Sequence, residues 1–176
     1  MVLVVIGKCA SGKTTCANYL KKAYDFIVFE IGDYVRKQYS LCQSEINLLD
    51  YVDSIFKEGK LSCFVKEALK DSKSQHNNNI AFVGIRTFEE LELIRKEYRD
   101  LVLLNIVCSE KNRNKRYHKQ KSDAVSLTLR TNTENEWNKI GFLELVDYEL
   151  NNDSTKEELY NSIDKIYKIL LFGGIK

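Results

Sequence analysis

The sequence predicts one α/β domain over residues 1–176, in which helices cover both faces of a five-stranded, mainly parallel sheet. Three observations support this three-layer α/β/α arrangement. The chain has 176 residues, a length that suits one domain with one compact core. Short runs rich in β-branched residues alternate along it with segments of helical periodicity. The first of these runs leads directly into a glycine-rich turn and then a helix.

The N-terminal part is predicted to open as β-α-β. The first strand is expected at 2–6, because an apolar run without polar alternation is typical of a strand buried on both faces. A helix is expected over about 14–23 and a second strand at 26–29. Residues 33–74 show mostly helical periodicity, so we expect two or three helices packed to one side of the sheet.

The second half continues the alternation. Thr87 and Glu90 match a capping box, in which the two side chains satisfy free amide donors at a helix start, and the helix should reach about residue 98. Ser109 is expected to start a strongly basic helix. The other predicted elements are strands at 80–83, 101–108 and 146–150, a helix at about 124–137 and an amphipathic terminal helix from Ser154.

Composition and charge exclude several classes of function. The 27 basic and 25 acidic residues give a net charge of +2, so we expect no nucleic-acid partner and no membrane partner. The apolar runs are far shorter than the roughly 20 residues of a membrane-spanning helix. The five cysteines show no CxxC pair or zinc-ligand spacing and the start is not signal-like, which predicts a reducing, cytoplasmic location.

The turn after the first strand carries the pattern GxxxxGK[ST], typical of a P-loop NTPase. Gly7 and Gly12 permit a close backbone approach, so that successive amides can point at phosphate oxygens. Lys13 is expected to reach the β- and γ-phosphates, Thr14 to offer Mg²⁺ its hydroxyl, and Thr15 to lie near the α-phosphate at the positive end of the helix. The predicted ATP-binding residues are Gly7, Lys8, Cys9, Ala10, Ser11, Gly12, Lys13, Thr14 and Thr15.

Arginines favour phosphoryl transfer over nucleotide binding alone. Transfer between two anions needs cations that hold the acceptor phosphate and neutralise charge on the transferred group. Arg36 follows the second predicted strand and Arg86 the third, so both should lie at the edge where open α/β sheets bind ligands. Arg113 and Arg116 are three residues apart on one face of the basic helix.

The combination resembles the nucleoside monophosphate kinases, and more closely the dephospho-CoA-kinase-like nucleotide kinases, over nearly the whole chain. Residues 32–36, Gly-Asp-x-x-Arg, are similar to the family segment whose arginine grips the acceptor phosphate. Residues 84–86, Gly-Ile-Arg, are similar to a second such segment. The resemblance implies an acceptor-binding helical region at about 33–74, and the predicted acceptor residues are Asp33, Arg36 and Arg86.

The resemblance also implies a short lid over about 113–124. Residues 109–116 resemble the family's basic lid helix, which clamps the donor phosphates. Arg130 falls in step with a closing segment where a family arginine contributes to phosphoryl transfer. The predicted catalytic residues are therefore Lys13, Arg113, Arg116 and Arg130.

The chain departs from the family at one position. The family usually ends the third strand with an aspartate that holds the hydration shell of Mg²⁺, and here that residue is Val83. Asp33, expected on the neighbouring loop after the second strand, is the candidate to hold the shell together with Thr14. The predicted cofactor is thus Mg²⁺, with Thr14 and Asp33 as its residues.

The predicted function is in-line transfer of the ATP γ-phosphate to a phosphate oxygen of a (deoxy)nucleoside monophosphate. Such an acceptor is already nucleophilic, so no general base is required. A hydroxyl acceptor, as in dephospho-CoA, would need a base, for which Asp33 is the candidate. A nucleotide-binding regulatory or slow-ATPase module is the other alternative, and Val83 is the feature in its favour. Base and sugar preference stay open, because residues 40–74 show packing but no chemical pattern.

Overall fold

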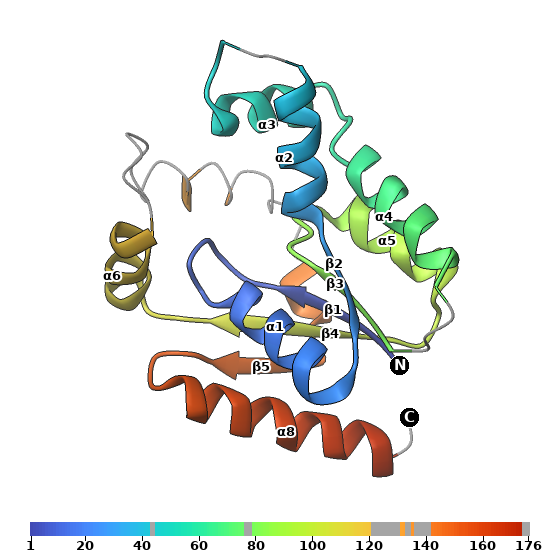
Figure 1. The fold of residues 1–176 in the computed structure, drawn as a ribbon, viewed down its shortest axis with the longest axis vertical. Helices are drawn as coiled ribbons and strands as arrows, with labels where there is room; N and C mark the ends of the chain where they lie inside the picture. Colours follow the sequence, from blue (N-terminus) through green and yellow to red (C-terminus); the bar gives the residue numbers. More distant parts are fainter. Residues whose placement is uncertain (43–44, 76–78, 121–130, 133–134, 136–141, 174–176) are drawn as a thin grey trace.

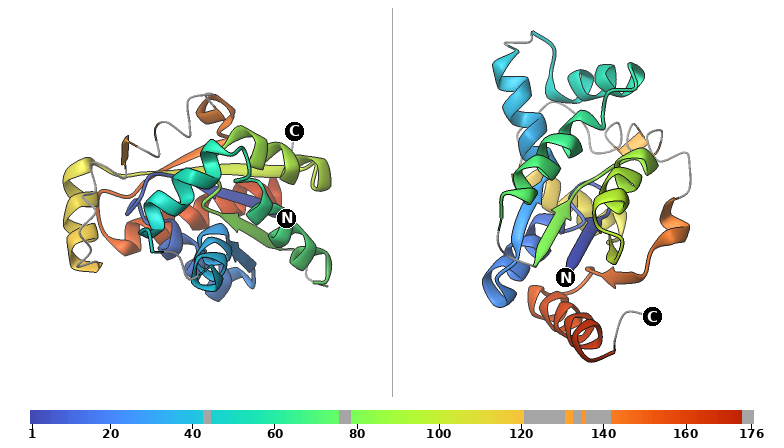
Figure 2. Two further views of the ribbon diagram at one scale, coloured as in Figure 1. Left: turned by 90° about the horizontal axis from the view of Figure 1, so that it is seen from above. Right: turned by 90° about the vertical axis from the view of Figure 1, so that its right-hand side faces the viewer.

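The predicted α/β/α architecture is confirmed. The computed structural model describes residues 1–42, 45–75, 79–120, 131–132, 135 and 142–173. Its five-stranded sheet has the order β2-β3-β1-β4-β5, and every neighbouring pair of strands is parallel. Helices cover both faces of the sheet (Figures 1 and 2).

The strands agree with the sequence prediction to within two residues. The second strand extends one residue further than expected, so that its last residue is Glu30. The fifth starts two residues later than expected, at Tyr148. The five strands are β1 (Val2–Ile6), β2 (Ile27–Glu30), β3 (Ile80–Val83), β4 (Leu101–Val107) and β5 (Tyr148–Asn151).

The region predicted to hold two or three helices contains three. The first of them begins at Ile31, directly after β2, so Gly32 and Asp33 lie in a helical turn rather than in a loop. The helix predicted over 124–137 falls mostly outside the described residues. The described helices are α1 (Lys13–Tyr24), α2 (Ile31–Leu41), α3 (Leu48–Lys57), α4 (Cys63–Lys73), α5 (Phe88–Glu97), α6 (Glu110–Gln120), the 3₁₀ turn η1 (Phe142–Leu145) and α8 (Lys156–Phe172).

Side-chain caps determine where two helices begin. The predicted capping box of α5 is present, because the Thr87 hydroxyl accepts from the Glu90 amide and the Glu90 carboxylate accepts from the Thr87 amide. The terminal helix α8 begins one residue later than the Ser154 start implies. Its cap is Thr155, whose hydroxyl accepts from the amide of Glu158 at 3.2 Å.

The sheet separates two hydrophobic cores. Alternate residues of β1 face opposite sides, as the pleat requires. Val4 packs with residues of α2, α3, α4 and α5 on one side. Val5 packs with α1 and α8 on the other. The phosphate loop (residues 7–14) emerges at the carboxyl end of β1, between α6 on one side and α2 on the other (Figure 1).

The described helices differ from membrane-spanning helices in length and in polarity. The longest of them, α8, has 17 residues and carries lysines and glutamates along its length. Within the described ranges, no helix is both long and apolar enough to cross a membrane.

Candidate active site

The phosphate loop needs glycine at both of its glycine positions. Gly7 and Gly12 have φ angles of +141° and +111°, which residues with a side chain rarely adopt. A Cβ on Gly7 would lie 2.4 Å from the carbonyl oxygen of Ile106 in β4. A Cβ on Gly12 would lie 2.1 Å from Nδ2 of Asn152, which follows β5. The two glycines therefore also let the loop pack closely against two other segments of the chain.

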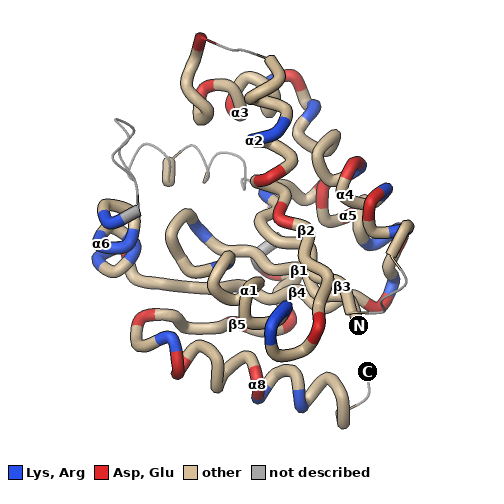
Figure 3. The backbone as a smooth tube through the Cα atoms, viewed as in Figure 1, with Lys and Arg blue, Asp and Glu red and all other residues tan. Residues whose placement is uncertain are grey.

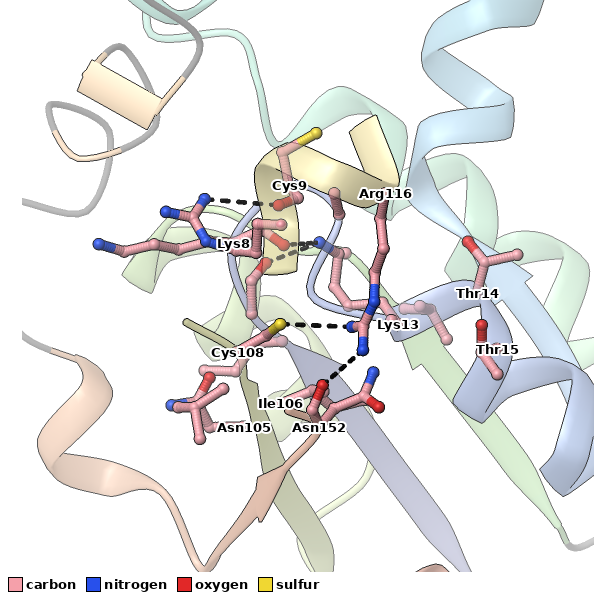
Figure 4. A pocket seen from close by; sticks show the side chains of 18 of the residues that line it. Lys8, Cys9, Lys13, Thr14, Thr15, Asn105, Ile106, Cys108, Arg116 and Asn152 are labelled. Atoms are coloured by element: carbon pink, nitrogen blue, oxygen red, sulfur yellow. Dashed lines mark hydrogen bonds between the residues drawn. The ribbon is translucent and has the colours of Figure 1, made fainter. Parts of the chain in front are cut away.

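Lys13 folds back over the phosphate loop. Its Nζ donates to the carbonyl oxygens of Gly7 at 2.7 Å and Lys8 at 3.0 Å (Figure 4). The hydroxyl of Ser11 is buried in the same loop and makes no hydrogen bond within the described part of the chain. Buried polar groups are normally satisfied, so this hydroxyl is unusual for the interior of a folded chain.

The loop forms the floor of an open cleft of about 970 Å³. This volume lies at the upper end of the range for small-molecule sites. The walls come from α2, α6, the segment after β3 and the ends of β4 and β5. The predicted loop residues line it, except Ser11, which lies buried beneath. The cleft can therefore hold more than one ligand group around the loop.

The basic helix α6 brings both of its predicted arginines to the phosphate loop. Lysine and arginine residues cluster along this helix (Figure 3). Arg113 is buried and donates from Nη1 to the carbonyl oxygen of Cys9 at 3.5 Å and to Oγ1 of Thr131 at 3.2 Å. Arg116 donates to the carbonyl oxygen of Asn152 at 2.7 Å (Figure 4). Both guanidinium groups therefore lie against backbone carbonyl oxygens of the phosphate loop.

Arg116 makes further contacts that tie three segments together. Its Nη1 group lies 3.4 Å from the carbonyl oxygen of Ser11 and 3.3 Å from Sγ of Cys108. Burial raises the pKa of the Cys108 thiol, and the Arg116 charge works against that rise. The loop, the end of β4 and the segment after β5 thus share one guanidinium group.

Asp153 holds the start of α6 from a distant segment. Its Oδ1 accepts from the Ser109 hydroxyl at 2.6 Å, the Ser109 amide at 2.8 Å and Nδ2 of Asn112 at 2.9 Å. The hydrogen bonds from the Ser109 side chain and backbone lower the pKa of Asp153 from 3.8 to about 2. The Ser109 start predicted for this helix is thus confirmed, with Asp153 as a second cap.

Arg86 reaches the cleft from the turn after β3. Gly84 has φ +84°, and a Cβ there would lie 3.9 Å from Cε of Lys13, so this turn runs close to that lysine. The Arg86 amide donates to Oε2 of Glu90 at 2.6 Å. Burial raises the pKa of Glu90, and hydrogen bonds from the Arg86 and Thr87 amides oppose the rise. Arg86 was predicted to lie at the edge of the sheet where ligands bind, and in the structure it lines the cleft at that edge.

Arg36 also lines the cleft, whereas its neighbour Asp33, a predicted metal residue, is not among the described residues that line it. Asp33 is ion-paired with Arg36, one turn along α2, and its side chain is 68% exposed. The reason is that α2 starts immediately after β2, so Asp33 points along the helix surface. The carboxylate that contacts Thr14 belongs to Glu30, whose Oε2 accepts from Thr14 Oγ1 at 3.1 Å.

Two residues that contact the phosphate loop were not among the site residues predicted from the sequence. Glu30 could have been noticed as an acid at the end of the second apolar run. The amide of Asn152, which donates to the carbonyl oxygen of Ser11 at 2.6 Å, left no local signal. Arg130 and the lid residues from 121 to 124 lie outside the described residues.

The parallel sheet, the glycine loop at the start of α1 and the cations around the cleft define a P-loop kinase fold. The chain belongs to the AAA domain family, whose model matches residues 3–138. No curated protein sequence matches the chain at a significant level.

Solved structures with a similar fold include three kinases. Shikimate kinase from Acinetobacter baumannii, in complex with shikimate, has a TM-score of 0.61 at 12% identity, covering 99% of this chain and 95% of that chain. Shikimate kinase from Aquifex aeolicus has a TM-score of 0.60 at 19% identity, covering 99% of this chain and 100% of that chain. A sugar kinase from Janibacter sp. has a TM-score of 0.58 at 15% identity, covering 96% of this chain and 95% of that chain. At these identities the likeness shows the fold, and the nucleoside monophosphate kinase assignment stays a prediction.

Proposed function

We propose that this protein transfers the γ-phosphate of ATP to a phosphate oxygen of a small phosphorylated acceptor, a ribo- or deoxynucleoside monophosphate. The observation that carries the proposal is that Arg36 and Arg86 line the same cleft as Lys13. They come from α2 and the turn after β3, across the cleft from α6. Guanidinium groups bind phosphate oxygens with two parallel hydrogen bonds, so a pair of them suits an acceptor phosphate.

The donor side consists of the phosphate loop and α6. The loop amides and Lys13 hold the donor phosphates, while Arg113 and Arg116 stabilise the charge that spreads over the transferred group. Because donor and acceptor share one cleft, transfer becomes effectively intramolecular. The hydroxyl oxygen of Thr14 is the kind of hard ligand that Mg²⁺ prefers, and bound Mg²⁺ would neutralise charge on the β- and γ-phosphates.

The position of Asp33 favours a phosphate acceptor over a hydroxyl acceptor. A hydroxyl needs a general base within hydrogen-bond reach. Asp33 is engaged with Arg36 and is not among the described residues that line the cleft. A phosphate oxygen is nucleophilic without such a base. The dephospho-CoA type of reaction is therefore left without Asp33, the candidate base that the sequence suggested for it.

The test is an acceptor panel. The protein is incubated with ATP, Mg²⁺ and each ribo- and deoxynucleoside monophosphate or dephospho-CoA, and the ADP and the phosphorylated product are separated by chromatography. We expect at least one nucleoside monophosphate to yield its diphosphate. Lys13→Ala should lose this activity, whereas Lys21→Ala, on the exposed face of α1, should keep it.

Two results would contradict the proposal. If no acceptor raises ADP formation above the background ATPase rate, the chain is not a kinase for these compounds. If dephospho-CoA alone is phosphorylated, the acceptor class is wrong.

A further inference from the structure

A carboxylate and a hydroxyl from two different elements meet at the edge of the phosphate loop. Thr14, in the first turn of α1, donates from Oγ1 to Oε2 of Glu30, the last residue of β2, over 3.1 Å. Both residues line the central cleft with Lys13. Thr14 and Thr15 lie together at the α1 end of the loop (Figure 4). Two oxygen groups are thus adjacent where the loop motif predicts the metal of a bound nucleotide.

The register of the sheet shows that Glu30 is next to the strand end where the expected aspartate is missing. Glu30 pairs with Val83 across β2 and β3. Paired residues of a parallel ladder project to the same face of the sheet. Val83 packs into the core beneath α1, so Glu30 also projects toward α1. A carboxylate is therefore present one strand to the side, at the end of β2 instead of β3.

We infer that Glu30 is the protein carboxylate of a divalent-cation site that it forms with the hydroxyl of Thr14 and the phosphates of the bound nucleotide. The inference rests on the proposed nucleotide donor site. A hydroxyl has one proton and two lone pairs. Since Glu30 accepts the proton, the lone pairs of Thr14 are left for a cation, and Glu30 adds the negative charge.

The available donors suit Mg²⁺ bound together with a nucleotide. In the described part of the chain, no group of three or more His, Cys, Asp and Glu side chains could hold a metal ion. Mg²⁺ is usually held by one or two carboxylates together with substrate phosphates and water, not by a cage of protein ligands. One carboxylate and one hydroxyl are therefore sufficient protein groups for a Mg²⁺ site only when the phosphates of the nucleotide are also present.

The assignment replaces Asp33 in this role. Asp33 lies three residues beyond Glu30, within α2, and its carboxylate is neutralised by Arg36 on the exposed helix surface. Glu30 has its carboxylate on Thr14 itself. The two candidates are close in sequence and identical in charge, so exchanging each for its amide gives a matched comparison.

The experiment measures metal binding directly. Mn²⁺ is titrated into the protein saturated with ADP, and free Mn²⁺ is followed by electron paramagnetic resonance for the parent chain, Glu30→Gln, Asp33→Asn and Glu58→Gln. Glu58 is an exposed residue after α3 and serves as the control. In Glu30→Gln the new side-chain amide oxygen can still accept from Thr14, so the local structure is retained while the charge is lost. We expect Glu30→Gln to weaken Mn²⁺ binding about 10- to 100-fold.

A second measurement separates the metal from the nucleotide. The affinity for a fluorescent ADP analogue is measured with Mg²⁺ and again with EDTA. Glu30→Gln should lower the affinity in Mg²⁺ and leave the affinity in EDTA unchanged, while Glu30→Asp, which keeps the charge, should recover part of the loss. Asp33→Asn and Glu58→Gln should match the parent chain in both.

The inference is overturned if Glu30→Gln binds Mn²⁺ as tightly as the parent chain, or if Asp33→Asn is the variant that loses the metal. It is also overturned if Glu30→Gln lowers nucleotide affinity equally with and without Mg²⁺. No acceptor is present in either measurement. A failure of the acceptor panel would therefore contradict the proposed transfer reaction without affecting this result.

Discussion

The side-chain amide of Asn152 donates to the carbonyl oxygen of Ser11 over 2.6 Å, and its nitrogen lies so close to Gly12 that a Cβ there would clash with it. The two residues are 141 positions apart in the sequence. Through this contact the segment after β5 holds the backbone of the phosphate loop in place. Arg116 holds the same segment from α6 by donating to the Asn152 carbonyl oxygen. The shape of the loop therefore depends on residues well outside the glycine motif.

We predict that Asn152→Ala weakens ATP binding about tenfold, because losing this buried hydrogen bond costs about 1–2 kcal/mol and loosens the loop. Isothermal titration with ATP measures the effect, and Asn161→Ala on the exposed face of α8 is the control. Gly12→Ala should bind ATP still more weakly. Combining it with Asn152→Ala should restore only part of the loss, because the φ angle of +111° remains unfavourable. Full restoration of ATP affinity in the double variant would show that Gly12→Ala weakens binding only through its clash with Asn152.

Removing either acceptor arginine should raise the acceptor KM with little change in the KM for ATP. Arg36→Ala and Arg86→Ala each delete charge-assisted hydrogen bonds worth about 1.5–3 kcal/mol, which corresponds to a rise of about 10- to 100-fold. Steady-state kinetics with the best acceptor of the panel measures both constants. Arg99→Ala, an exposed arginine before β4, is the matched control. An unchanged acceptor KM in both variants would disprove the acceptor assignment.

Asp153→Asn should destabilise the protein in a pH-dependent way. The pKa of Asp153 is lowered from 3.8 to about 2 in the folded protein, so between these values the unfolded chain binds more protons. The stabilising contribution is complete well above 3.8 and is lost as the pH falls toward about 2. Urea unfolding from neutral to acidic pH should therefore show a gap between parent and variant that narrows below about pH 4.

The control for this series is Asp100→Asn, an exposed carboxylate in the turn before β4. Its unfolding curve should follow that of the parent chain. A gap between parent and Asp153→Asn that stays constant down to the lowest pH would contradict the role of the Asp153 charge at the start of α6.

Cys16 should be unreactive in the folded protein. Burial of Cys16 on the core-facing side of α1 raises the pKa of its thiol to about 12, and only the thiolate reacts with iodoacetamide. This rise in pKa lowers the thiolate fraction about a thousandfold near pH 8. Mass spectrometry should find the exposed Cys42 alkylated first and Cys16 alkylated only after unfolding. Equal rates for both thiols in the native state would show that this core is open.

Local signals accounted for most of the fold prediction. The apolar run of β1, the glycines of the phosphate loop and the Thr87–Glu90 cap each act within a few residues, so the sequence alone locates them. The boundary between β2 and α2 was the consequential exception. β2 ends at Glu30, one residue later than predicted, and α2 begins at the next residue. Glu30 therefore lies at the strand end beside the phosphate loop, and Asp33 lies on the surface of a helix.

The sequence by itself determined the class of fold, the phosphate loop and the arginines at the carboxyl ends of β2 and β3, because periodicity, turn chemistry and a short motif are local properties. Only the tertiary structure decided which carboxylate stands at Thr14, and that Arg116 and Asn152 brace the loop. Those contacts join segments that strand register and helix packing bring together. Strand register at Val83 places a carboxylate on the neighbouring strand, a relationship that no stretch of the sequence contains.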